Sequence, residues 1–314
     1  MKKFKIVFFG TDNFSAPTLR KLLKSDSFEI LAVVTKPDAV RKRGKIIEPP
    51  LIATIAQEFN SQNPKDKIKI FQPDKLHEIE SELRELNPDI GVLVSYGKIV
   101  PQSTIDIFPR GIINFHPSLL PKYRGPSPIE SAILNGDKET GLTLMKLAKE
   151  MDAGPILYQE KINLNNENAP ELREKFAQRG AELLADKLPK ILSGEISEIE
   201  QKNNDATYCR LFTKSDGEIN PKIENSARIE RKVRAYLEWP KTRLNFAKLD
   251  SEVFAKFPDQ DIIITRAEIL AQFSGDSWPD VIKCAENTHL QIVRIISPKS
   301  GKEMNFSDYL HGLK

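Results

Sequence analysis

An asparagine and a histidine two residues apart form the chemically most informative pair in the sequence. Asn114 and His116 lie in Gly111-Ile-Ile-Asn-Phe-His-Pro117, an apolar run that predicts a β-strand ended by proline. Side chains two residues apart in a strand point to the same face, so these two project together. An amide can donate to a developing oxyanion, and an imidazole can move a proton near neutral pH. The pair suits acyl transfer, although Asn114 could instead cap a loop and His116 could simply pack.

A carboxylate further along the chain could complete this pair. Asp152 lies in Lys149-Glu-Met-Asp-Ala-Gly-Pro155, directly before another predicted strand. In that turn it could pair with His116 and hold the imidazole charged and oriented. Asp-x-Gly-Pro is also ordinary turn chemistry. Only the fold can bring positions 116 and 152 together.

Two basic stretches are candidates for contact with phosphates. Lys36-Pro-Asp-Ala-Val-Arg-Lys-Arg-Gly-Lys45 carries five cations and one acid in a loop at the carboxyl end of a predicted strand, where it could clamp phosphates. A second stretch mixes six cations with two aromatic residues: Arg228, Arg231, Lys232, Arg234, Lys241, Arg243, Tyr236 and Trp239. Such interleaving suits RNA, but a solvated helix face would explain it as well.

The turn after the first predicted strand, Gly10-Thr-Asp-Asn-Phe14, stands where a dinucleotide-binding loop would stand. It lacks the pattern G-x-G-x-x-G, whose second and third glycines let a pyrophosphate approach the backbone. The turn therefore argues against a nicotinamide-dependent dehydrogenase.

Composition narrows the class of protein. The chain has 314 residues, 39% of them hydrophobic and 29% charged, which is ordinary for a globular protein of up to two domains. Its net charge of +3 does not by itself indicate nucleic acid. Cys209 and Cys284 have no metal-site spacing, so we expect a reducing, cytoplasmic compartment and no metal. No apolar run approaches the ~20 residues of a membrane span, so we expect no membrane partner.

Alternating strands and helices must position the candidate residues. Short apolar runs predict strands at residues 4–9, 30–35, 68–71, 90–95 and 111–116, and helical spacing predicts helices at 16–23, 50–59 and 76–86. This alternation predicts an α/β fold with a mostly parallel wound sheet covered on both faces. A helix at 128–134 and a pair of strands at 143–147 and 156–161 are expected to follow.

The second part of the chain has a different pattern. Asn168 and Glu171 are spaced as a capping box, and the helix that they begin should end before Gly194. Residues 195–206 contain few apolar side chains and predict a linker. From about Tyr208 the sequence predicts one helix at 227–237 and short strands at 242–248, 262–270, 281–283 and 290–296. Many short strands fit a small barrel.

With these residues in place, the chain resembles the methionyl-tRNA formyltransferase family over nearly its whole length. The strongest part is Asn114-Phe-His-Pro-Ser-Leu-Leu-Pro121, followed by Arg124-Gly125 and Pro128-Ile129. It is similar to the motif N-x-H-x-S-L-L-P of transferases that use 10-formyltetrahydrofolate. Further similar segments are Phe9-Gly-Thr11, Val94-Ser-Tyr-Gly97, Met151-Asp-Ala-Gly154 and the tail from Lys302 to Gly312.

The resemblance implies a domain order and a set of site residues. It implies a Rossmann-like catalytic domain at 1–193, a linker at 194–207 and an OB-like, tRNA-binding barrel domain at 208–314. The residues implied as catalytic are Asn114, His116 and Asp152. Those implied for the folate site are Ser118, Leu119, Leu120, Pro121, Tyr96 and Gly97, and those for tRNA are Arg41, Lys42, Arg43 and Lys45.

The function implied is transfer of a formyl group from 10-formyltetrahydrofolate to the free amino group of initiator methionyl-tRNA in translation initiation, by an enzyme expected to be a monomer. One alternative is a formyltransferase of the same fold that acts on a small amine, such as glycinamide ribonucleotide or an amino sugar-nucleotide. Another is a non-catalytic RNA-binding protein. The basic loop and the β-rich second part favour tRNA, because a small substrate needs neither.

Two positions depart from the family pattern. Between Asp38 and Lys45 the family more usually has proline and an extra glycine, where this chain has Ala39-Val40-Arg41-Lys42. The positive charge of the loop survives this change. Tyr123 stands where the family often has tryptophan, which keeps an aromatic ring.

Overall fold

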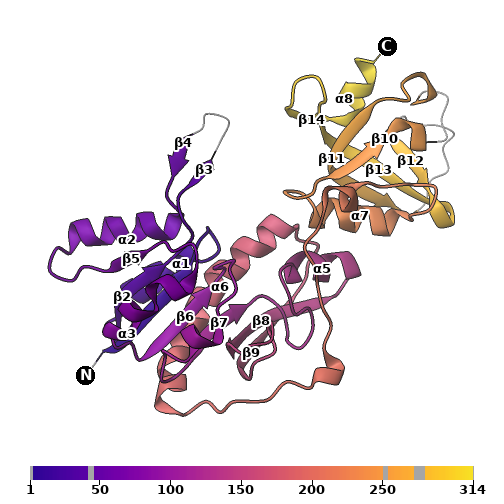
Figure 1. Cartoon of the computed structure of the whole chain (residues 1–314). Helices are drawn as coiled ribbons and strands as arrows, with labels where there is room; N and C mark the ends of the chain where they lie inside the picture. The colour runs from indigo at the N-terminus through magenta and orange to yellow at the C-terminus, as the bar shows by residue number, and fades with distance from the viewer. Residues whose placement is uncertain (1–2, 42–45, 250–253, 272–279, 314) are drawn as a thin grey trace. The chain divides into compact units, whose positions relative to one another are not determined.

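The chain forms two compact units, seen in a computed structural model that describes residues 3–41, 46–249, 254–271 and 280–313 (Figure 1). The first unit consists of Met1–Gly125, Glu139–Asn163 and Arg173–Tyr208. The second unit consists of Pro126–Lys138, Leu164–Leu172 and Cys209–Lys314. Two short segments from the middle of the chain therefore belong to the same unit as the carboxyl-terminal part.

A seven-stranded sheet with the order β5-β2-β1-β6-β7-β8-β9 forms the centre of the first unit. The strands are β1 (Phe4–Gly10), β2 (Phe28–Val34), β5 (Lys69–Phe71), β6 (Ile90–Val94), β7 (Ile112–His116), β8 (Glu139–Lys146) and β9 (Ile156–Asn163). The first five strands in this order are parallel, and β8 and β9 pair antiparallel at one edge. The predicted mostly parallel α/β sheet is confirmed.

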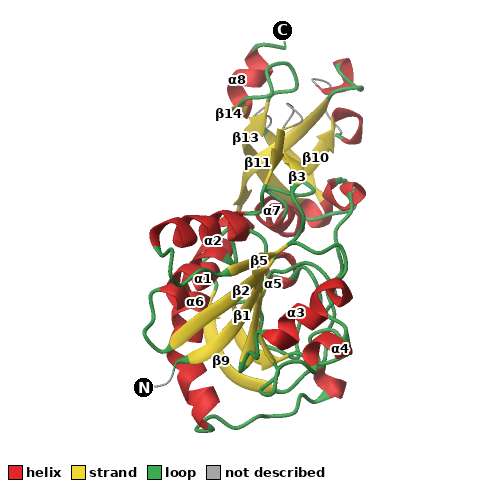
Figure 2. Ribbon diagram, turned by 60° about the vertical axis from the view of Figure 1, so that its left-hand side comes forward, coloured by secondary structure: helices red, strands yellow, loops and turns green. Residues whose placement is uncertain are grey.

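Helices lie on both sides of this sheet (Figure 2). They are α1 (Ala16–Leu23), α2 (Leu51–Gln62), α3 (Glu80–Glu85) with the preceding 3-10 turn η1 (Leu76–Ile79), α4 (Gln102–Ile105) and α6 (Ala169–Ser193). The start of α6 is the predicted capping box. The Glu171 amide donates to Asn168 Oδ1 at 3.0 Å, and the Asn168 amide donates to Glu171 Oε2 at 3.1 Å. None of the described helices could cross a bilayer.

The segment predicted as a basic loop contains one short strand, which pairs with another just after the segment. β3 (Ala39–Arg41) pairs antiparallel with β4 (Ile46–Glu48). Each strand has only three residues, and Val40 and Ile47 are exposed, so no alternation of buried and polar residues marks them in the sequence. Lys42, Arg43 and Lys45 lie outside the described residues.

The second unit is built around an antiparallel sheet with the order β10-β11-β13-β12, and β14 pairs with β13. Its elements are α5 (Pro128–Asn135), α7 (Ser226–Ala235), β10 (Thr242–Asn245), β11 (Asp261–Leu270), β12 (Val281–Cys284), β13 (Thr288–Ile296), β14 (Glu303–Asn305) and α8 (Phe306–His311). Ile229 and Val233 of α7 join the core formed by the strands. β14 and α8 were not predicted, because three and six residues are too few to show a period. The 3-10 turns of this unit are η3 (Lys214–Gly217), η4 (Phe246–Lys248), η5 (Phe254–Lys256) and η6 (Ala285–Asn287), whereas η2 (Asn203–Asp205) lies in the first unit.

The strand that carries the candidate pair is fixed from its other face. The Phe115 ring is buried and stacks on Phe14 with ring centres 5.3 Å apart and an interplanar angle of 8°. At Gly180 of α6, an added Cβ would lie 2.2 Å from Phe115 Cζ. Glycine at this position therefore lets α6 approach β7, and the contact between Gly180 and Phe115 determines the distance between the helix and the strand.

Gly180→Val should therefore destabilise the first unit by about 1–3 kcal/mol, the usual cost of overpacking a core. Glu174→Val on the exposed face of the same helix is the matched control, because it adds the same β-branched side chain without a clash. Urea unfolding at 25 °C measures both variants. Equal stabilities of the two would show that α6 moves away from Phe115 at little cost.

Candidate functional site

The candidate residues gather at the carboxyl ends of β1, β6 and β7. β1 lies between β2 and β6, so the chain order reverses there, and such switch points bind ligands in open α/β sheets. The turns that follow β1 and β6 are joined by two side-chain hydrogen bonds. Thr11 Oγ1 donates to the Tyr96 carbonyl at 2.9 Å, and Ser95 Oγ donates to Asp12 Oδ2 at 2.7 Å. This edge of the sheet is thus a connected rim.

The structure brings His116 and Asp152 together. His116 Nδ1 lies 3.6 Å from Asp152 Oδ2, and the His116 side chain is only 6% exposed. Its other nitrogen, Nε2, lies 3.0 Å from the Tyr123 carbonyl oxygen. A carbonyl oxygen only accepts, so Nε2 carries a proton, and the ring gains or loses its second proton at Nδ1. Nδ1, the nitrogen left to accept or donate, therefore faces the carboxylate.

Asn114 lies beside this pair on the same face of β7. It is buried within the sheet, where β7 pairs with β6 on one side and β8 on the other. Its side-chain amide forms no hydrogen bond with any residue in the part of the chain that the structure describes. Buried amides normally have partners. An amide without one at a ligand-binding edge can donate to a bound molecule.

Three residues of this edge have left-handed backbone. Asp152 has a φ of 50°, Tyr123 of 58° and Ser95 of 47°. Left-handed backbone at non-glycine residues costs roughly 1–3 kcal/mol each and gathers at functional sites. Asp tolerates this region better than most residues. Asp152, whose carboxylate faces the imidazole, is thus one of the residues with this unusual backbone.

Side chains of the two strands β8 and β9 form hydrogen bonds with the segment Ser118–Pro121. Thr143 of β8 donates from Oγ1 to the Ser118 carbonyl at 2.6 Å, and the Leu120 amide donates to the same hydroxyl at 3.2 Å. Gln159 of β9 donates to the Leu120 carbonyl at 2.8 Å. Ser118 and Leu120 are buried, while Leu119 and Pro121 are partly exposed. Thr143 and Gln159 were missed, because nothing local distinguishes them from other strand residues.

The remaining predicted folate residues, Tyr96 and Gly97, differ in their surroundings. The Tyr96 ring is buried in the core, where it packs edge-on against Phe9 at 5.8 Å, and burial raises its pKa to about 12. Gly97 is exposed with a φ of +73°, and a Cβ there would lie 2.4 Å from Lys36 Nζ. Gly97 is therefore the member of the pair that faces outward, next to a cation.

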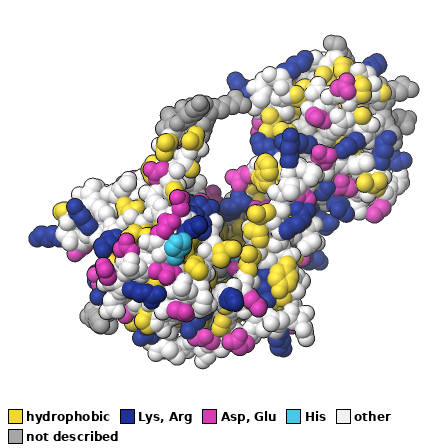
Figure 3. Space-filling view, viewed as in Figure 1, with side chains coloured by type: hydrophobic (Ala, Val, Ile, Leu, Met, Phe, Trp, Pro, Cys, Tyr) yellow, Lys and Arg dark blue, Asp and Glu magenta, His cyan; other side chains and the backbone are white. Residues whose placement is uncertain are grey.

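Of the four predicted tRNA residues, the structure places only Arg41, the last residue of β3. Much of the second basic stretch is paired within the second unit. Lys232 lies 2.7 Å from Glu224, and Arg234 lies 2.6 Å from Glu230. Figure 3 accordingly shows acidic side chains among the Lys and Arg side chains of this unit.

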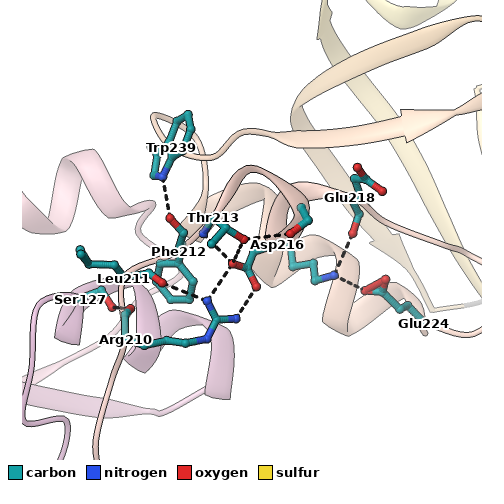
Figure 4. A network of polar contacts seen from close by, with 11 residues as sticks. Ser127, Arg210, Leu211, Phe212, Thr213, Asp216, Glu218, Glu224 and Trp239 are labelled. Atoms are coloured by element: carbon teal, nitrogen blue, oxygen red, sulfur yellow. Dashed lines mark hydrogen bonds and ion pairs between the residues drawn. The ribbon is translucent and has the colours of Figure 1, made fainter.

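An aromatic side chain in the second unit remains at the surface. Trp239 is 57% exposed, and its Nε1 donates to the Phe212 carbonyl at 3.0 Å (Figure 4). Nearby, Arg210 Nη1 donates to Asp216 Oδ2 at 2.9 Å, and this guanidinium holds the pKa of Asp216 well below its usual range. Arg210 is therefore paired with an acid, whereas the Trp239 ring remains exposed.

Comparison with solved structures shows a shared fold. An N-formyltransferase from Helicobacter canadensis, solved with folinic acid and dTDP-3-aminofucose, matches with a TM-score of 0.65 and 22% identity over 92% of this chain and 98% of its own. HypX from Aquifex aeolicus, solved with tetrahydrofolic acid, matches with a TM-score of 0.63 and 13% identity over 98% of this chain and 47% of its own.

Sequence comparison identifies the family. The formyl transferase family model matches residues 4–188. The methionyl-tRNA formyltransferase of Thermodesulfovibrio yellowstonii is 37% identical over 98% of this chain and 96% of its own length. That of Acetivibrio thermocellus is 41% identical over 75% of this chain and 74% of its own. This chain therefore belongs to the formyl transferase family and, within it, to the methionyl-tRNA formyltransferases.

Proposed function

We propose that the protein transfers the formyl group of 10-formyltetrahydrofolate to the α-amino group of initiator methionyl-tRNA in the cytoplasm, as a monomer. The observation that carries the chemistry is the His116–Asp152 contact beside the unpartnered Asn114 amide. The full-length similarity to methionyl-tRNA formyltransferases supports tRNA as the acceptor.

The donor is proposed to bind along the turns that follow β6 and β7. Leu119 and Pro121 offer apolar surface to a flat ring, and the exposed backbone of Gly97 lets a ligand approach closely. The Lys36 ammonium beside Gly97 suits the carboxylates of a folate. Ser118, Leu120 and Tyr96 are buried beneath these two turns and support them. No cluster of metal ligands occurs among the described residues.

The three candidate catalytic residues have separate roles in this mechanism. The amine forms a C–N bond to the formyl carbon, and the Asn114 amide donates to the oxygen that becomes negative. One such donor is worth roughly 2.7–4 kcal/mol in a transition state. A free α-amine titrates near ~7.7–8.0, so the attacking form must be generated by loss of a proton. His116 Nδ1 accepts this proton while Asp152 stabilises the charged ring. The proton then passes to the folate nitrogen as the bond between that nitrogen and the formyl carbon breaks.

The tRNA is proposed to contact both units. In the first unit the basic segment Arg41, Lys42, Arg43 and Lys45 would hold phosphates. In the second, residues 208–314 are proposed to form an OB-like domain, a proposal that the five-stranded antiparallel sheet with its own apolar core supports. Residues 1–193 would form the catalytic domain, with 194–207 as the linker. The exposed Trp239 ring suits stacking on an unpaired base.

The direct test mixes the purified protein with 10-formyltetrahydrofolate and methionyl-tRNA and looks for formyl-methionine on the tRNA. We expect formylation of charged initiator tRNA and none of glycinamide ribonucleotide or amino sugar-nucleotides. Formylation of a small amine alone would favour the small-substrate formyltransferase. Tight tRNA binding without consumption of the donor, whatever the acceptor, would favour a non-catalytic RNA-binding protein.

Asn114→Ala should lower turnover by about 10²–10³, because it removes the proposed oxyanion donor. Asn163→Ala is the control, since it removes the same amide at the exposed end of β9. Steady-state formylation assays and thermal unfolding should be run on both variants. Turnover near that of the parent in folded Asn114→Ala would exclude the oxyanion role.

Replacing Arg41, Lys42 and Arg43 together by alanine should weaken tRNA binding and flatten its dependence on salt. Each lost phosphate contact removes about 0.7–0.9 from the slope of log K against log salt. The control replaces Lys65, Lys67 and Lys69, three exposed cations at the amino end of β5 and therefore at the opposite edge of the parallel sheet. Filter binding from 50 to 200 mM salt measures both. Equal slopes in the two triple variants would show that the 41–43 segment does not hold phosphates.

A further inference from the structure

Gln201, in the segment between α6 and the second unit, is hydrogen-bonded to the loop that carries Asp152. Its Nε2 donates to the Asp152 carbonyl at 2.9 Å and to the Gly154 carbonyl at 2.7 Å. Both amide protons of one side chain are thereby used on a single turn. Gln201 belongs to the first unit, as does the turn.

A buried arginine fixes the orientation of this amide. Arg124 is 1% exposed, and it donates to Gln201 Oε1 from Nε at 3.0 Å and from Nη2 at 2.8 Å. A guanidinium only donates, so the oxygen of Gln201 must face Arg124 and the nitrogen must face the two carbonyls. Arg124 Nη2 also donates to Asn203 Oδ1 at 3.0 Å. The amide therefore has one arrangement that satisfies all its partners.

The same network reaches the carboxylate of Asp152. Gly125, which follows Arg124, donates from its amide to Asp152 Oδ2 at 2.8 Å. Asp152 is thus held at two points, its carbonyl by Gln201 and its carboxylate by Gly125. Its left-handed backbone, with a φ of 50°, is a conformation that needs such support. Loss of either contact would let the turn relax away from His116.

Backbone pairing ties the rest of this segment to the site. The Thr207 amide donates to the Pro121 carbonyl at 3.1 Å, and the Arg124 amide donates to the Thr207 carbonyl at 2.8 Å. Ile199 and Ile156 exchange two hydrogen bonds of 2.8 and 2.9 Å. Residues 199–208 therefore connect the loop after β7 to the start of β9, which follows the Asp152 turn.

We infer that Gln201 is a positioning residue, which holds the Asp152 carboxylate beside the His116 ring. The inference rests on the proposed function for its kinetic consequence and on the contacts alone for its structural one. Gln201 itself would touch neither the formyl donor nor the acceptor amine. It acts through Asp152.

Gln201→Glu is the sharpest test, because it keeps the shape and the acceptor for Arg124 but sets a carboxylate oxygen against two carbonyl oxygens. We expect kcat to fall about 10–10²-fold, the scale of a small misplacement of a catalytic group, with KM for both substrates close to the parent's. Gln201→Met, similar in size and without N–H donors, should change kcat in the same direction. Asn203→Ala is the matched control, since it removes a bond to the same guanidinium without touching residues 152–154.

A second readout does not require activity. The His116 ring signals in the NMR spectrum at fixed pH, assigned with His116→Gln, should move in Gln201→Glu towards their positions in Asp152→Asn and stay in place in Asn203→Ala. Ring signals that stay in place in folded Gln201→Glu would overturn the inference. So would an equal loss of kcat in Asn203→Ala, which would assign the effect to Arg124 rather than to Asp152. An inactive parent with the expected shifts would instead reject the proposed function and leave the positioning role supported.

Discussion

The arrangement of the first unit depends on holding a carboxylate against a largely buried imidazole. The 3.6 Å contact between His116 and Asp152 places two titratable groups where water has little access, and such groups need polar partners. The Tyr123 carbonyl and the Gly125 amide provide one partner each. Both lie in the same loop after β7, so that loop sets the geometry of imidazole and carboxylate together.

The strand β7 links this polar arrangement to the apolar core. Because strand side chains alternate, Phe115 points away from Asn114 and His116 and packs towards Phe14 and α6. The position of α6 against the sheet therefore bears on the position of the polar face of the strand. The absence of a side chain at Gly180 is therefore part of the same geometry that positions the amide and the imidazole.

The polar sheet edge of the first unit and the cations of the second unit differ in their partners. At the sheet edge of the first unit, His116 and Asp152 have backbone partners. The Asn114 amide forms no hydrogen bond with any described residue. In the second unit, Lys232, Arg234 and Arg210 are each paired with an acid of the same unit. The Trp239 ring of the same unit remains exposed.

The sequence by itself determined the elements with a clear period, their order and the segment that carries Asn114 and His116. The helix at 16–23 and the capping box at Asn168 are local features, set by neighbours along the chain, and the structure contains both. Tertiary structure alone decided that Asp152 meets His116 and that Gln201 and Thr143 hold the loops around them. These contacts join residues from separate turns and strands, and no spacing in the sequence encodes them, because the distance between two loops is set by how strands pair and helices pack. The pairing of β3 with β4 appeared only in the structure for the same reason, and β14 and α8 did so because they are too short to show a period.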